Sequence, residues 1–427
     1  NSEIVASGVT ILNEGDSDII FRQPVRNVTA TFDIQNRGGD IRAESPDFFF
    51  EVGAAGSLSL DASGGSIGSA TEPLQTRLVR GKLLPDGSPS TRNVELFANA
   101  GDGVYLDVTG VNTTFAEYDP SEIVDGVRLH LSAGGPIDVR LSQSELIDDQ
   151  GVSYPAAGQY EIAQAESATG DVTILHGHAG DLNVAHASAL TGDVNLIATD
   201  GDLALTAVHA AAAVHAQASG SVVDGGDAAT DVAAASVQLH AGGSIGGGNA
   251  LEVDVTGTES LTAVAEQDIE VTDVDGDLYV GLAESATGDV ILAASDGDLH
   301  LTTVRAPAGG VELTAADSIL LSPAAETAVA GLSAQLMATE GAIGTVTRPL
   351  TLDTDSSLGV TGTAATGMHI AETAGDLRVV TLLTDTGDAG LTASDGSILL
   401  GYVAALQGGI TLLARDSLVN ADDAGAG

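Results

Sequence analysis

The chain has 427 residues with a formal net charge of −46, 54 Gly, 3% aromatic residues and no Cys or Trp. This charge repels nucleic acids and anionic membranes, and the lack of Cys excludes disulfides and thiolate metal sites. A hydrophobic fraction of 43% is too high for a disordered chain, so we expect an ordered fold whose layers are thin enough to do without aromatic side chains.

The sequence shows neither a signal-peptide pattern at its start nor a stretch that would span a membrane as a helix. The chain begins at Asn1 rather than at Met, and no signal-peptide pattern follows. No run of 18 apolar residues, the length that a membrane-spanning helix needs, occurs in it. We therefore expect a processed form or a segment of a longer protein, with no membrane span.

Residues 1–160 form a less regular first stretch. Short phrases such as Gly39-Asp40-Ile41 alternate with stretches that contain Pro, at 81–89, 113–127 and 142–159. We expect these stretches to be loops that leave the coils of one continuous rod, or longer coils; a separate N-terminal domain is the alternative. In Phe48-Phe49-Phe50, strand alternation places at least one ring outward, either as a contact patch or under a covering loop.

Residues 161–427 repeat a Gly-Asp step followed by alternating apolar residues. The first four steps begin at Gly170, Gly180, Gly192 and Gly201, so every second step recurs after one period of about 21 residues. Apolar residues at every second position, such as Val194 and Leu196, indicate short half-buried strands, and Gly-Asp is turn chemistry. The sequence therefore predicts two strands for each period.

A longer repeat of 98–99 residues lies on top of the short one. Gly276 and Gly288 have counterparts 99 residues later, at Gly375 and Gly387. The octapeptide Ala-Glu-Ser-Ala-Thr-Gly-Asp-Val also occurs twice, at 165–172 and at 283–290. A propeller needs about 40–50 residues per blade, and a sandwich does not require a fixed spacing of about 21 residues. The pattern predicts an all-β, parallel β-helix (β-solenoid) of about 20 coils of about 21 residues, with a core of Val, Leu, Ile and Ala.

One family resemblance rests on the phrase Gly-Ser-Ile-Gly-x-x-x-x-Pro-Leu at 65–74, followed by Gly-Asp-Leu and Gly-Asp-Val strands. This pattern resembles the filamentous-haemagglutinin-like adhesins and related giant repeat proteins of bacterial surfaces, and the likeness is best over 161–420. The resemblance implies a right-handed parallel β-helix that is secreted or held at the cell surface. The N-terminal secretion domain of such proteins is not recognisable in this chain.

One candidate calcium site lies at Asp273-Val274-Asp275-Gly276-Asp277. Glu284 occupies the twelfth position of a calcium-binding loop, but Leu278 stands at the sixth, where the helix-loop-helix site needs Gly. We therefore expect, at most, a looser calcium site at a coil corner, formed by Asp273, Asp275 and Asp277. The alternative is three turn aspartates that face water, and no other cofactor is expected.

The Asp residues of successive Gly-Asp corners raise a separate question of charge. If Asp171 and Asp193 occupy equivalent corners, they stand about 4.8 Å apart and repel each other. They either splay into solvent, the interpretation that we favour, or they are compensated by backbone amides and cations.

Neither the histidines nor the loops predict an enzyme. Six of the nine His residues lie between 176 and 240, and we expect solvated strand or loop positions because no third metal ligand has a fixed register with His176 and His178. If a polysaccharide-active site exists, it is expected near Tyr118, Asp119, Asp148, Asp149 and Tyr154.

The sequence therefore predicts a structural extracellular protein, a shaft, stalk or filament segment of a bacterial surface adhesin. Unpaired strand edges at the coil ends favour end-to-end self-association or continuation into neighbouring repeats. The main alternative is a binding module that recognises a cell-surface glycan or protein through its N-terminal loops, within 112–127 or 142–159.

Overall fold

The computed structural model describes residues 8–27, 31–45, 47–53, 57–80, 94–113, 123–147, 152–226, 229–258, 261–323 and 328–421. All regular elements in these ranges are β-strands, and they build a parallel β-solenoid of about 16 turns with about 23 residues per turn. The predicted fold class is thus confirmed, with fewer and longer turns than the sequence predicts. Right-handedness stays a prediction. In the same ranges no helix has the length and hydropathy to cross a membrane.

The chain divides into two compact units. The N-terminal unit comprises Asn1–Gly220 and Gly225–Asp227, and the C-terminal unit comprises Ser221–Asp224 and Ala228–Gly427. The boundary at residue 160 between less regular and regular coils concerns the sequence repeat, and it stays a prediction.

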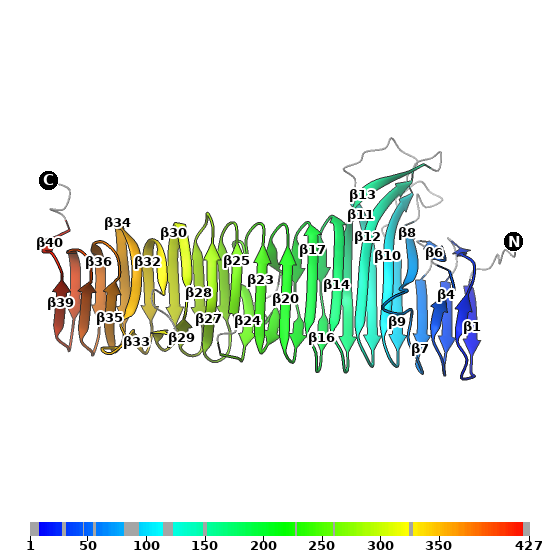
Figure 1. Ribbon diagram of the computed structural model, residues 1–427, viewed down its shortest axis with the longest axis horizontal. Coiled ribbons are helices and arrows are strands. Elements are labelled where there is room, and N and C mark those ends of the chain that lie inside the picture. Colours follow the sequence, from blue (N-terminus) through cyan, green and yellow to red (C-terminus); the bar gives the residue numbers. More distant parts are fainter. Residues whose placement is uncertain are drawn as a thin grey trace. The chain divides into compact units, whose positions relative to one another are not determined.

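The N-terminal unit contains the first twenty strands (Figure 1). They are β1 (Gly8–Asn13), β2 (Ile19–Phe21), β3 (Val25–Asn27), β4 (Thr31–Asn36), β5 (Ile41–Ala43), β6 (Phe50–Gly53), β7 (Ser57–Ala62), β8 (Leu74–Arg80), β9 (Val94–Ala100), β10 (Val104–Thr113), β11 (Ile123–Ala133), β12 (Ile137–Ile147), β13 (Ser153–Ser167), β14 (Val172–Ala179), β15 (Leu182–Val184), β16 (Ala187–Ala189), β17 (Val194–Asp200), β18 (Leu203–Leu205), β19 (Val208–Ala210) and β20 (Ala213–Ala218).

The C-terminal unit contains the remaining twenty. They are β21 (Val222–Asp224), β22 (Val232–Ala234), β23 (Ser236–Ala241), β24 (Leu251–Val255), β25 (Leu261–Ala265), β26 (Ile269–Asp273), β27 (Leu278–Ser285), β28 (Val290–Ala294), β29 (Leu299–Leu301), β30 (Val304–Ala315), β31 (Ile319–Leu321), β32 (Val329–Ala338), β33 (Ala342–Ile343), β34 (Leu350–Ala364), β35 (Gly367–Glu372), β36 (Leu377–Thr384), β37 (Ala389–Ala393), β38 (Ile398–Ala405), β39 (Ile410–Ala414) and β40 (Leu418–Asn420).

A regular coil of the N-terminal unit has three strands rather than the two that the sequence predicts. Strands β14, β15 and β16 pair in parallel with β17, β18 and β19 of the next coil. Val172 pairs with Val194 of that coil, at the spacing that the short repeat predicts. The third strand was missed because it is very short and has no Gly-Asp step before it.

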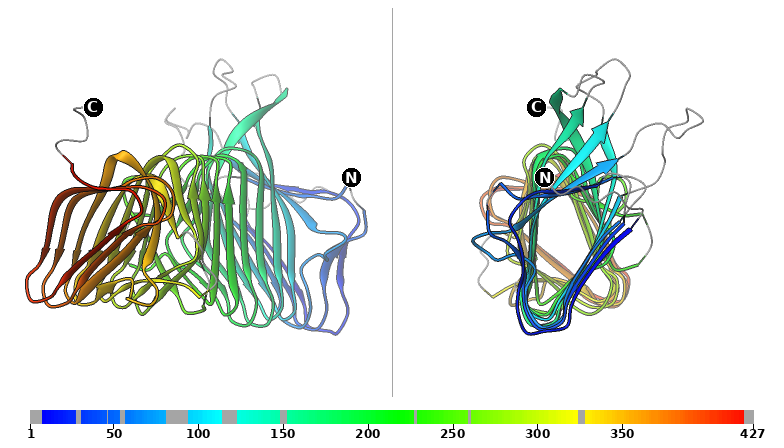
Figure 2. Two further views of the ribbon diagram at one scale, coloured as in Figure 1. Left: turned by 60° about the vertical axis from the view of Figure 1, so that its left-hand side comes forward. Right: turned by 90° about the vertical axis from the view of Figure 1, so that its right-hand side faces the viewer.

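Earlier coils of the N-terminal unit are longer, which explains the lower number of turns. Val104 of β10 pairs with Ile137 of β12, a separation in sequence half as long again as that between Val172 and Val194. Figure 2 shows β10 to β13 extending out of the coil, and β12 and β13 continue there as an antiparallel pair in which Leu146 faces Tyr154. The predicted excursions from the coils near 142–159 therefore include regular strands.

The longer repeat is visible in the pairing registers of the C-terminal unit. Leu251 pairs with Val271, and 99 residues later Leu350 pairs with Ile370. The same shift relates the pairs formed by β26 with β28 to those formed by β35 with β37. Two successive 99-residue segments thus form the same coils.

The Gly-Asp step is explained by contacts between successive coils. A Cβ built on Gly309 would lie 2.1 Å from the carbonyl oxygen of Gly288, so only Gly fits above another Gly at this corner. Asp289 Oδ1 accepts a hydrogen bond from Gly310 N of the next coil at 2.7 Å. Equivalent bonds join Asp171 to Asp193 N and Asp376 to Ser397 N. The interpretation that these carboxylates splay into solvent is therefore wrong, because backbone amides of the next coil compensate them.

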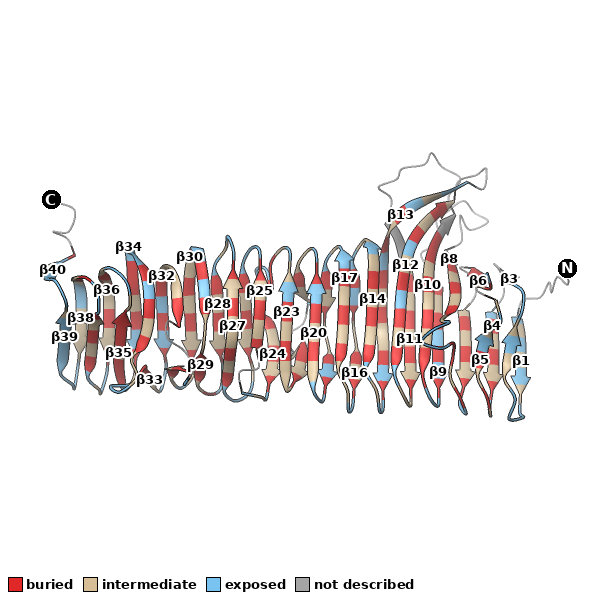
Figure 3. Cartoon of the chain, viewed as in Figure 1, coloured by how far each residue is buried: buried red, intermediate tan, exposed pale blue. Residues whose placement is uncertain are grey.

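The core consists of columns of aliphatic side chains. Figure 3 shows buried and partly exposed residues alternating along the strands. Val172, Val194 and Val214 pair in successive coils of the N-terminal unit, and all three are fully buried. Each large aliphatic side chain buried in this way contributes about 1.5–3 kcal/mol, so a narrow interior is stable without Trp.

Aromatic residues gather near the start of the N-terminal unit. Phe48 and Phe50 are buried and meet edge to face with ring centroids 4.9 Å apart. Phe49 points outward, where the guanidinium groups of Arg26 and Arg77 lie 4.8 Å and 5.4 Å from its ring centroid. One ring of the three thus faces out, as alternation predicts, and arginines cover it.

Candidate functional site

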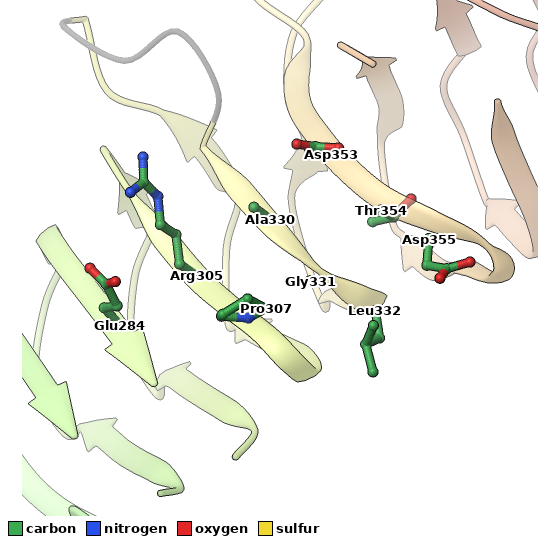
Figure 4. Close-up of a pocket in the computed structure, with 9 residues that line it drawn as sticks. All are labelled: Glu284, Arg305, Pro307, Ala330, Gly331, Leu332, Asp353, Thr354 and Asp355. Atoms are coloured by element: carbon green, nitrogen blue, oxygen red, sulfur yellow. The ribbon is translucent and has the colours of Figure 1, made fainter. Parts of the chain in front are cut away.

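An open pocket of about 450 Å³ lies on the outside of the C-terminal unit. Four strands of successive coils supply its lining, which comprises Glu284 of β27, Arg305 and Pro307 of β30, Ala330, Gly331 and Leu332 of β32, and Asp353, Thr354 and Asp355 of β34 (Figure 4). Strand pairing is irregular at this point, because the register shifts between Ala306 and Gly310 and between Gly331 and Ser333.

The pocket combines one cation with three carboxylates. Arg305, Asp353 and Asp355 are exposed, and Glu284 stands opposite Arg305 in the register of β27 and β30. The hydroxyl of Thr354 is already engaged, because it donates a hydrogen bond to Oε2 of the buried Glu372 at 2.9 Å. The nine described lining residues offer hydrogen-bonding groups for a polar ligand.

The three aspartates of the predicted calcium site have different environments. Asp273 is fully buried, and its Oδ1 accepts a hydrogen bond from Val255 N at 3.0 Å. Asp275 and Asp277 are exposed. Burial raises the pKa of Asp273 to about 7, and the negative charges of Asp254 and Asp275 add to the rise. A calcium site formed by Asp273, Asp275 and Asp277 stays a prediction.

Asp277 lies within metal-binding reach of residues from the next coil instead. One ligand atom each of Asp277, Asp298 and His300 lies within 4.8 Å of the others. Asp277 Oδ1 already accepts a hydrogen bond from Asp298 N at 2.9 Å, and the His300 ring stacks on Tyr279 with centroids 4.3 Å apart. The short repeat could have revealed this group, since Asp298 follows Asp277 by one coil.

A second group of three carboxylates was not foreseen from the sequence. Ligand atoms of Asp224, Asp231 and Glu252 lie within 4.8 Å of one another, and Asp231 is fully buried. Glu372 is also fully buried, and it stands 99 residues after Asp273. For Glu372, the signal in the sequence is an ionisable residue at a position where the next coil carries Ala393.

His176 corrects the expectation of solvated histidines. Its side chain is only 1% exposed, and its ring lies edge to face against Tyr160 at a centroid distance of 5.2 Å. Burial lowers the pKa of His176 to about 4. The register between β14 and β17 shifts after His176, so that His178 is exposed and the two histidines do not share a face.

The loop positions named for a polysaccharide-active site are largely outside the described residues. This holds for Tyr118, Asp119, Asp148 and Asp149. Tyr154 lies on β13, half-buried, within the antiparallel pair of β12 and β13.

Comparisons with known proteins give one family match. Residues 234–423 match the family model described as Toastrack DUF4097. No curated protein and no solved structure matches the chain. The match covers less than half of the sequence and lies in the C-terminal unit, so this part of the solenoid is similar to a Toastrack DUF4097 domain.

Proposed function

We propose that the chain is a structural segment, a shaft, stalk or filament-forming part of a bacterial surface adhesin of the filamentous-haemagglutinin-like kind. The observation that supports this most is the repetition of strand registers, coil after coil and again after 99 residues, in the C-terminal unit. Coils that contact only their neighbours add length without new chemistry, which is what a stalk requires.

The surface chemistry supports the same proposal. Many carboxylates at the coil corners accept a hydrogen bond from a backbone amide of the next coil. These acidic residues therefore join coils and also keep the exterior negatively charged. High net charge of one sign keeps proteins soluble and opposes lateral association. The absence of Cys is compatible with the proposed place outside the cell, and catalysis is not part of the proposal.

The last described coil supports end-to-end association as part of this function. Strands β39 and β40 each pair on one side only within the described residues. Five large apolar side chains of this coil are exposed by about half or more, namely Tyr402, Leu406, Ile410, Leu413 and Leu418. We propose that a further β-coil, from a second copy or from neighbouring repeats, covers this surface.

An anchored chain with a binding tag at its free end tests the stalk. The antigen that the tag recognises is presented at increasing distances from the anchoring surface. A tag carried by the chain should capture this antigen at distances that a tag fixed directly to the surface does not reach. The untagged chain should show no saturable binding to glycan arrays or to cultured cells. Saturable binding by the untagged chain would contradict the proposal.

The alternative proposal is a binding module, and the excursion formed by β12 and β13 is the observation that favours it. Replacing residues 146–154 with Gly-Asn-Gly would remove the outer part of this pair and keep the buried bond between Ser144 and Tyr160. Under this alternative the replacement abolishes attachment. Under the stalk proposal it leaves the capture of antigen by the tag unchanged.

A further inference from the structure

Three carboxylates converge in the C-terminal unit outside the pocket and outside the predicted calcium loop. Asp224 ends β21, Asp231 precedes β22, and Glu252 lies on β24. One carboxylate oxygen from each lies within 4.8 Å of the other two. We call this group the Asp231 cluster.

Backbone pairing fixes the geometry of the Asp231 cluster. Strands β22 and β24 are in register at Val232 and Val253, which sets Asp231 beside Glu252. Asp231 N donates to Glu252 O at 2.9 Å, and Glu252 N donates to Asp231 Oδ2 at 3.0 Å. Asn249 Nδ2 donates to Asp224 Oδ2. Each carboxylate is thus held in place by a bond to one of its two oxygens or to its own backbone.

Two oxygens of the Asp231 cluster lack the donor that their burial requires. Asp231 is 0% exposed, and its Oδ1 has no hydrogen-bond partner among the described residues. Glu252 Oε2 is buried and has no partner there either. A buried carboxylate oxygen without a donor costs several kcal/mol unless something positive or a proton meets it.

We propose that the Asp231 cluster binds one Ca²⁺ ion. All the side-chain ligand atoms of the cluster are carboxylate oxygens. Carboxylate oxygens suit hard cations and not the softer metals that prefer His or Cys. On the buried side of the cluster, oxygens of Asp231 and Glu252 replace water molecules of the ion, so the ion is partly dehydrated there. Mg²⁺ dehydrates reluctantly and demands octahedral geometry, whereas Ca²⁺ accepts irregular oxygen ligands, one or two from each carboxylate. Asp224 and Glu252 are half-exposed and leave a path for entry.

The group of Asp277, Asp298 and His300 does not support the same proposal. Asp277 is exposed, and its Oδ1 is already satisfied by Asp298 N. None of its three side chains combines full burial with an unpartnered oxygen among the described residues.

Calcium titration of the full chain tests the proposal. Isothermal titration calorimetry with CaCl₂ at pH 7.5 should show one site that is lost in Asp231→Asn and weakened at least tenfold in Glu252→Gln. At 100 times the dissociation constant, Ca²⁺ should raise the melting temperature of the C-terminal unit by roughly 5–10 °C over the chain in EDTA. Mg²⁺ should bind at least tenfold more weakly than Ca²⁺.

Control variants distinguish the loss of a ligand of the Asp231 cluster from the loss of one negative charge elsewhere in the chain. Glu312→Gln removes one charge from an outward position of β30, and Asp298→Asn removes one from the other acidic group; both should bind Ca²⁺ as the unchanged chain does. If Asp231→Asn does not fold, Asp224→Asn, whose residue is half-exposed, gives the same test. Absence of a Ca²⁺ signal in the unchanged chain would overturn the proposal. So would an unaltered signal in the cluster variants.

Discussion

Glu372 is a buried carboxyl at a position where the next coil carries Ala393. It accepts hydrogen bonds from Thr354 N and Thr354 Oγ1, but burial raises its pKa to about 7. A carboxyl with a raised pKa keeps its proton in the native state at pH values where the unfolded chain has lost it. The contribution of Glu372 to the free energy of unfolding is therefore largest below about pH 4.5 and falls as the pH rises toward and through 7.

Glu372→Gln should remove this pH dependence, because the amide keeps the shape of the neutral acid. A pKa difference of about 2.5 units between native and unfolded states corresponds to roughly 3 kcal/mol. The variant should exceed the unchanged chain by roughly 2–3 kcal/mol at pH 8 and equal it near pH 4.5. Denaturant unfolding of the C-terminal unit between pH 4.5 and 8 measures this, with Glu312→Gln as the control. Parallel pH profiles for Glu372→Gln and the unchanged chain would contradict the prediction.

His176 gives a pH dependence of the opposite sign in the N-terminal unit. Burial lowers its pKa to about 4, so the unfolded chain binds a proton below about pH 6.5 that the native state refuses. Stability contributed by neutral His176 is present above pH 6.5 and is lost as the pH falls to 4.

His176→Leu should flatten that loss, since Leu141 already occupies the paired position on β12. The unchanged chain should lose on the order of 3 kcal/mol from the N-terminal unit between pH 6.5 and 4 because of this residue. Thermal unfolding across that range provides the measurement. The control His178→Gln, at an exposed position, should keep most of the slope, because burial is the largest cause of the lowered pKa of His176. A slope retained by His176→Leu would show that other groups cause it.

At the scale of a strand and the corner before it, the side chain of Asp289 joins two coils through one hydrogen bond, which it accepts from Gly310 N. Asp289→Ala removes the acceptor of Gly310 N and should destabilise the C-terminal unit by about 1–2 kcal/mol. Asp289→Asn keeps an acceptor oxygen and removes a negative charge, so it should stay within about 0.5 kcal/mol of the unchanged chain. Urea unfolding of both variants checks the pair, and equal losses would mean that charge, not the bond, matters at this corner.

Sequence periodicity predicts strands well where the short repeat is strict. Strands such as β17 and β28 begin directly after a Gly-Asp step, as expected. The third strand in the regular coils of the N-terminal unit escaped because Ala187–Ala189 is short and does not follow a Gly-Asp step. His176 continues the buried alternation of Val172 and Ile174, and only the register shift after it, which the pairing with the next coil reveals, exposes His178.

The candidate sites could be predicted only in part. Asp277 was named as a candidate ligand together with Asp273 and Asp275, but the ionisable groups nearest to it are Asp298 and His300, because solenoid contacts join residues one coil apart. The Asp231 cluster has no counterpart in the 99-residue repeat, where Thr351 stands in the place of Glu252. In a repeat protein, the positions at which one copy differs from the others are therefore a better guide to candidate sites than the residues that all copies share.

At the scale of the whole molecule, stability in such an architecture is close to a sum of coil terms and nearest-neighbour terms. The C-terminal unit allows a direct test, because its registers coincide after 99 residues. Gly276 and Gly375 share positive φ angles of 84° and 80°, and they form equivalent bridges to Asp296 and Asp395. A cut and join at these two glycines therefore preserves the backbone of the corner.

Deleting residues 276–374 should leave a folded, shorter chain, because Asp275 then precedes Gly375 in the register that it has with Gly276. The shortened chain should keep its β-sheet circular dichroism and a cooperative unfolding transition of the C-terminal unit. The matched deletion of 276–364 joins Asp275 to Ala365, out of register by half a coil, and turns inward-facing positions into corners. It should be degraded by protease at concentrations that spare the in-register deletion. Equal resistance of the two deletions would show that the coils do not depend on register, and the nearest-neighbour account of this solenoid would then fail.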